Sequence, residues 1–95
     1  MSPSDGAWTA TLTVALPDPA EADWLASALG PESAREVPRA GASVHRRGPT
    51  TVEVVVRAAD AGAMRAALNT YLGWIELTLA TVRTARAAAS GVAKP

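Results

Sequence analysis

The sequence predicts an α+β domain with two layers, a three-stranded and mostly antiparallel sheet with two helices on one face. Apolar residues alternate with polar ones over residues 8–16 and 51–58, as in strands that bury one face. Two longer segments repeat apolar residues at helical spacing, and turns containing proline or glycine separate these elements. The predicted order is strand, helix, strand, strand, helix.

One folded domain is expected over residues 7–89, between a short tail at 1–6 and another at 90–95. The apolar fraction is 48%, but alanine supplies 22 residues, and leucine, isoleucine and valine together supply only 18. Because such a core is thin, we expect the domain to gain stability from a partner or from a second copy of itself.

The first strand, over residues 8–16, is followed at once by the first helix. Asp18 is placed to cap this helix, and Pro19 suits its first position. We expect the helix to stop at Gly30 and Pro31, because this pair is typical of helix C-termini.

The second and third strands are predicted to form a hairpin. Residues 42–46 alternate weakly, residues 47–50 have the composition of a turn, and residues 51–58 form the clearest strand in the chain. Valines at alternate positions of this last strand give it one continuous apolar face.

The second helix is predicted to be long, from a cap at Asp60 to about Ala89. Its apolar residues recur at helical spacing and form one stripe, which we expect to face the sheet. The stripe consists of Met64, Leu68, Tyr71, Leu72, Ile75, Leu79 and Val82.

Surplus apolar surface on both helices predicts a partner-binding face. Trp74 and Leu77 are expected opposite the core stripe, in a bed of small residues that lets another helix approach closely. The alternative is that Trp74 packs sideways against the first helix and widens the core. The predicted partner-binding residues are Trp24, Ala28, Ala66, Thr70, Gly73, Trp74 and Leu77.

Catalytic, metal and cofactor sites are not expected. The chain has no cysteine and a single histidine, His45. Asp18, Glu21 and Asp23 cluster at the start of a helix, where the helix dipole explains them. Glycine-rich phosphate-binding motifs are missing from the sequence. We therefore predict that the chain is not an enzyme.

The charge balance argues against strong nucleic-acid binding, since nine basic residues offset nine acidic ones. The glycine spacing of KH domains is missing, and Trp8 is alone among the strand aromatics that an RRM domain needs. Arg46, Arg47 and Arg57 are candidate contacts to a phosphate backbone. A stand-alone small RNA-binding module therefore stays open as an alternative.

The run from Arg57 to Asp60 and the helix opening Met64–Trp74 are distinctive. They resemble the small dimerising, Pcc-type subunit of the archaeal and eukaryotic KEOPS complex. In that family the helix opens with LRAALNS, and here Met64 and Thr70 replace the leucine and the serine. The resemblance covers about residues 8–85.

This resemblance implies a strand-helix-strand-strand-helix fold and a non-catalytic role. The complex attaches a threonylcarbamoyl group to adenosine 37 of tRNA, and a separate metal-dependent subunit performs the transfer. The small subunit of the family binds that catalytic subunit through its two helices and forms a homodimer, so any tRNA contact is indirect or weak. We expect a cytoplasmic protein, since residues 1–6 lack the features of a secretory signal and no segment has the length of a membrane span.

Overall fold

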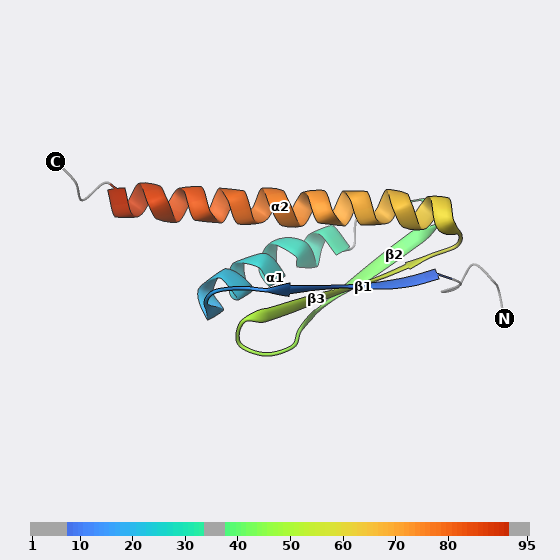
Figure 1. Cartoon of the computed structure of the whole chain (residues 1–95), viewed down its shortest axis with the longest axis horizontal. Coiled ribbons are helices and arrows are strands. Elements are labelled where there is room, and N and C mark those ends of the chain that lie inside the picture. Colours follow the sequence, from blue (N-terminus) through green and yellow to red (C-terminus); the bar gives the residue numbers. More distant parts are fainter. Residues whose placement is uncertain (1–7, 34–37, 92–95) are drawn as a thin grey trace.

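The computed structural model describes residues 8–33 and 38–91. Its elements are β1 (Trp8–Ala15), α1 (Pro19–Ser33), β2 (Ala40–Arg46), β3 (Thr51–Ala58) and α2 (Ala61–Gly91). Figure 1 shows both helices on the same side of the sheet, with α2 as the longest element. The predicted α+β class and element order are confirmed.

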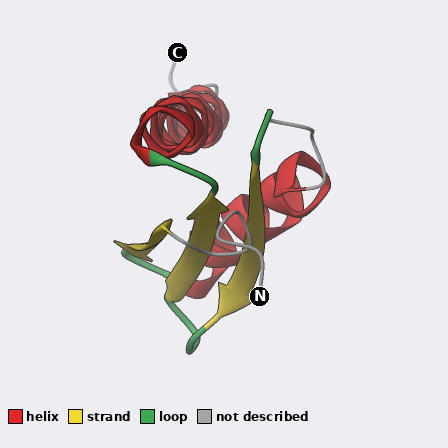
Figure 2. Ribbon diagram, turned by 90° about the vertical axis from the view of Figure 1, so that its right-hand side faces the viewer, coloured by secondary structure: helices red, strands yellow, loops and turns green. Residues whose placement is uncertain are grey.

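The sheet has the order β1-β3-β2, and both neighbouring pairs are antiparallel. Val54 of β3 lies opposite Leu12 of β1 on one side and opposite Val44 of β2 on the other. β1 and β2 therefore run parallel to each other without pairing, and α1 carries the chain between these two edges. Figure 2 views α2 nearly end-on and shows α1 at an angle to it.

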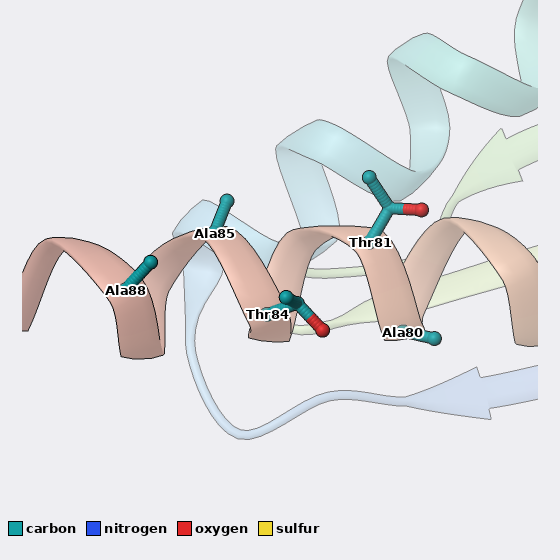
Figure 3. Close-up of a pocket in the computed structure, with 5 residues that line it drawn as sticks. All are labelled: Ala80, Thr81, Thr84, Ala85 and Ala88. Atoms are coloured by element: carbon teal, nitrogen blue, oxygen red, sulfur yellow. The ribbon is translucent and has the colours of Figure 1, made fainter.

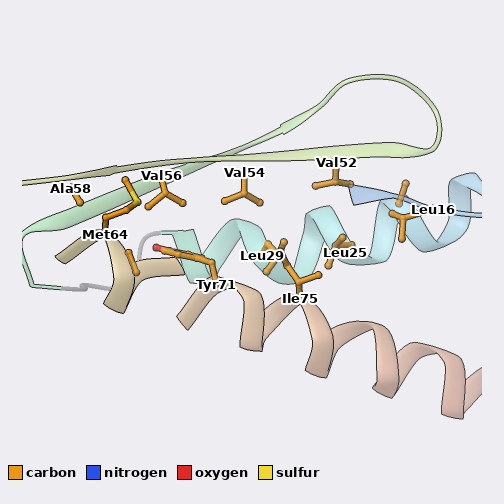
Figure 4. Close-up of a cluster of buried hydrophobic side chains, with 12 residues drawn as sticks. Leu16, Leu25, Leu29, Val52, Val54, Val56, Ala58, Met64, Tyr71 and Ile75 are labelled. Atoms are coloured by element: carbon orange, nitrogen blue, oxygen red, sulfur yellow. The ribbon is translucent and has the colours of Figure 1, made fainter. Parts of the chain in front are cut away.

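The core lies between the inner face of β3 and the two helices (Figure 4). Alternate β3 residues from Val52 to Ala58 are buried, which confirms the one-sided pattern of this strand. Leu25 and Leu29 reach this layer from α1, and Tyr71 reaches it from α2. The opposite face of the sheet is covered by neither helix and carries mainly threonine and charged residues.

Both helices begin as their capping residues predict. Asp18 Oδ1 accepts a hydrogen bond of 2.9 Å from the backbone N–H of Glu21, and Asp60 Oδ1 accepts one of 2.8 Å from the N–H of Ala63. These bonds satisfy N–H groups that have no partner within the first helical turn. Within the described parts of the chain, neither helix has both the length and the apolarity needed to cross a membrane.

The predicted end of the first helix is wrong, because α1 continues through Gly30 and Pro31 to Ser33. Gly30 does not take the left-handed conformation of a C-terminal cap; positive φ angles among the described residues occur at Arg39 and Gly48. The fixed φ of proline is itself compatible with a helix, and so close to the end its missing N–H costs one hydrogen bond. α2 likewise ends at Gly91, two residues beyond the predicted end.

The predicted buried stripe of α2 needs one correction, at Leu72. Its side chain is 45% exposed, whereas Ala67 is fully buried. The buried face of α2 is centred on Met64, Tyr71 and Ile75. At about 100° per residue, Leu72 projects about 80° away from the direction of Met64, at the margin of the core.

Candidate functional site

Large apolar side chains that stay exposed point to a binding surface more directly than the core does. Among the described residues these are Trp8, Trp24, Leu72 and Leu77. Three of the four belong to the helices, and none lies on the outer face of the sheet. The helical layer is therefore the candidate location of a docking site.

The structure places Trp74 differently from the prediction. Its side chain is half-buried and packs against the hydrophobic core, so it does not lie opposite the core stripe. Trp74 is ten residues from Met64, which turns it about 80° from the centre of the buried face. Leu77 projects about 140° from that centre, and its side chain is 58% exposed.

Small exposed residues continue from Leu77 along the same side of α2. Ala80, Thr81, Thr84, Ala85 and Ala88 line a shallow hollow on this helix alone (Figure 3). Toward the N-terminus of the helix, Ala66 and Gly73 are also exposed, and the Thr70 hydroxyl donates a hydrogen bond of 3.0 Å to the Ala66 carbonyl. We call this surface the α2 strip; it comprises Ala66, Thr70, Gly73, Leu77, Ala80, Thr81, Thr84, Ala85 and Ala88.

Part of the α2 strip lies beyond the rest of the fold. Figure 1 shows the C-terminal part of α2 extending past α1 and the sheet, and every residue from 83 to 89 is exposed. The sequence predicts only that the second helix ends at about Ala89. The signal that could have revealed this surface is the recurrence of alanine and threonine at helical spacing from Leu77 onward.

Trp24 lies in a different environment from Leu77. The guanidinium of Arg86 stands over the Trp24 ring, 5.9 Å from its centroid. Arg86 follows Leu77 by nine residues, which is half a turn around the helix. The structure therefore places Trp24 and Leu77 on different sides of α2, whereas the sequence predicts both on one partner-binding face. Ala28 is exposed on α1, and it too lies outside the α2 strip.

Charged side chains connect the start of α1 to the C-terminal part of α2. Arg86 Nη1 lies 2.9 Å from Asp18 Oδ2 and 3.2 Å from Glu21 Oε2. Arg83 Nη2 lies 3.2 Å from the other carboxylate oxygen of Glu21. We call these four residues the α1–α2 clasp. Glu21 is only 5% exposed, so its two arginines compensate a carboxylate that is removed from water.

The clasp also shifts the pKa values of Asp18 and Arg86. The backbone N–H of Glu21, together with the Arg86 guanidinium, holds the pKa of Asp18 below its usual 3.8. Asp18 in turn raises the pKa of Arg86, which stays charged under all ordinary conditions.

The three predicted RNA-contact residues do not form one basic surface. Arg46 pairs with Asp23, and its guanidinium also donates to the Pro49 carbonyl at 2.9 Å. Arg47 pairs with Glu53 at 2.9 Å. Arg57 is exposed on the outer face of β3, and it forms no ion pair with another described residue. Two of the three positive charges are thus balanced locally.

Nothing in the described structure assembles a metal site, because no group of three histidine, cysteine, aspartate or glutamate side chains is suitably placed there. The single histidine, His45, lies on the outer face of β2, and its Nε2 is 3.0 Å from the hydroxyl of Ser43. That contact is a local one within the strand.

A family model described as "Transcription factor Pcc1" matches residues 9–83, from the first strand into the last third of α2. No curated protein sequence matches the chain.

Proposed function

The chain belongs to the Pcc1 family, and we propose that it acts as a dimerising and docking subunit of a KEOPS complex. Pcc1 is a non-catalytic KEOPS subunit family, and the motif at residues 57–74 gave the same assignment from sequence. In this proposal a separate subunit transfers threonylcarbamoyl to adenosine 37 of tRNA, in the cytoplasm. The balanced charge of the chain does not favour direct DNA binding, so we regard an effect on transcription as downstream.

The observation that carries the docking proposal is the α2 strip. Small side chains allow a partner helix to approach α2 closely, and Leu77 supplies one large apolar anchor among them. Because the end of α2 extends past the sheet, a partner can reach it without contacting the strands. We propose that the catalytic subunit occupies this strip. A further role for Trp24 and Ala28 in docking, as the sequence suggested, stays a prediction.

Self-association is the second part of the proposal. β1 and β2 are edge strands, each with one side unpaired within the described chain. Trp8, on the inner side of β1, is 49% exposed, so the helices leave this edge partly uncovered. We propose that two copies join through a sheet edge around a two-fold axis, which would produce a six-stranded antiparallel sheet.

Contact with tRNA is indirect or weak in this proposal. Arg46 and Arg47 already form ion pairs with acidic neighbours, so few basic groups are left to neutralise phosphates. The rival RNA-binding module requires tight binding with a steep salt dependence. Binding of the isolated chain to tRNA at two salt concentrations separates the two proposals.

Gly73 offers a direct test of docking. A Cβ at this exposed position would meet no atom within 4 Å, so Gly73→Leu fits the free chain. The added side chain would hold a partner helix away from the strip. We expect the affinity for the catalytic subunit to fall by about tenfold or more. The melting temperature of the Gly73→Leu variant should not fall, because leucine favours a helix more than glycine does.

The matched control is Glu76→Leu, which adds a leucine at another exposed position of α2 outside the strip. This variant should bind the catalytic subunit as the wild type does. Equal affinities for Gly73→Leu and the wild type would show that the partner does not use this strip.

A further inference from the structure

We infer that the α1–α2 clasp orders the last turns of α2, and that Arg86 is a positioning residue for the α2 strip. The inference rests on the proposed docking role of the strip. It concerns a part of the molecule that the partner itself need not touch. Arg86 projects about 160° away from Thr84 of the strip, so it faces the opposite side of the helix.

The clasp provides the last contacts between α2 and the rest of the described fold. Leu79 still packs against the core and Val82 is half-buried, but all residues from 83 to 89 are exposed. Beyond Val82, the contacts that tie α2 to α1 are the ion pairs of Arg83 and Arg86. A helix end without tertiary contacts frays in water, even when it is rich in alanine.

Arg86 is the stronger of the two ties. Its guanidinium bridges the carboxylates of the capping residue Asp18 and of Glu21 in α1, and it also lies over the Trp24 ring. These three residues follow one another at intervals of three, so one planar group contacts the cap and the first turns of α1. Lysine could keep the charge, but it lacks the planar fork that makes hydrogen bonds while it stacks on an aromatic ring.

Fixing this end of α2 matters for docking because the strip extends into it. Thr84, Ala85 and Ala88 lie beside or beyond the clasp in sequence. If these turns frayed in the free chain, a partner would have to order them upon binding, and that cost would lower its affinity. Because the clasp orders these turns in the free chain, the partner does not have to order them upon binding.

The experiment compares Arg86→Gln with Arg46→Gln in the full chain. Arg46 is a matched control because it also forms an ion pair with α1, through Asp23, but it belongs to β2 and not to α2. Arg83 still contacts the buried carboxylate of Glu21 in the Arg86→Gln variant, so the fold should persist. Two quantities are measured: hydrogen exchange of the amides of residues 83–89, and affinity for the catalytic subunit.

For Arg86→Gln we expect exchange at residues 83–89 to become about tenfold faster, while the core amides of β3 keep their rates. Affinity should fall by about fivefold to tenfold. Arg46→Gln should change neither quantity, and Arg86→Lys should restore part of both. Unchanged exchange in Arg86→Gln would overturn the clasp as an ordering device. Faster exchange with unchanged affinity would overturn its role in docking.

These results also separate the inference from the proposed function. A wild-type chain that fails to bind the catalytic subunit would contradict the proposed function and, with it, the docking role of Arg86. The exchange measurement would still decide whether the clasp orders α2.

Discussion

Trp74 and Leu77 show how a difference of three residues on one helix changes what a side chain does. Trp74 packs against the core, whereas Leu77 is mostly exposed. Trp74→Ala should therefore destabilise the fold by about 1–3 kcal/mol, through lost packing. Leu77→Ala should change stability by less than about 0.5 kcal/mol. Urea unfolding of both variants measures the difference, and equal destabilisation would contradict these placements.

Asp18 makes the stability of the domain depend on pH. Its folded pKa is lowered by the N–H of Glu21 and by Arg86, so its charged form is favoured in the folded state. Asp18 therefore stabilises the fold above its ordinary pKa of 3.8, and this contribution is lost as the pH falls through the lower folded value. Melting temperatures of the wild type and Asp18→Asn should differ at pH 7 and converge at strongly acidic pH. A constant difference across that range would contradict this assignment.

At the scale of the element, the cap of α2 is a discrete contribution to stability. Asp60 accepts the hydrogen bond from Ala63 and also forms an ion pair of 2.5 Å with Arg39. Asp60→Ala should cost about 1 kcal/mol, whereas Asp60→Asn should cost less because asparagine caps helices nearly as well. Thermal unfolding of the two variants tests this order, and equal losses would show that the charge, which both variants remove, matters more than the cap.

The third strand and the helix starts could be predicted from the sequence because their signals are local, whereas β2, with its weak alternation, begins at Ala40, two residues before the predicted strand. Alternation identified β3 to the residue, and Asp18 and Asp60 cap as expected. The end of α1 could not be predicted in this way, since Gly30 and Pro31 are compatible both with a helix end and with a continued helix. The local preferences of these two residues did not distinguish the two conformations.

The α2 strip could not be predicted fully, because a sequence pattern does not give the exact direction of each side chain or the way in which two helices cross. The periodicity of α2 separates buried from exposed faces only to within a fraction of a turn, and Trp74 and Leu72 both lie near that boundary. The separation of Trp24 from Leu77 depends on how α1 crosses α2. The clasp joins residues more than 60 positions apart, such as Asp18 and Arg86, so no local sequence motif predicts it.

At the scale of the whole molecule, the proposed function assigns two separate surfaces of the domain to two kinds of partner. The sheet presents edges that suit a second copy, and the far end of α2 presents a strip that suits another protein. The two surfaces lie on different elements, so one chain can use both at once. A homodimer would then carry two docking strips, and each could bind one catalytic subunit.

The most direct test of this arrangement is the mass in solution of the purified chain mixed with the catalytic subunit of its KEOPS complex, measured by light scattering at tens of micromolar. The chain alone should have the mass of a dimer, and the mixture should form a complex with two copies of each protein. A chain that stays monomeric, or a mixture whose components elute separately, would contradict the central claim that this protein joins two catalytic subunits.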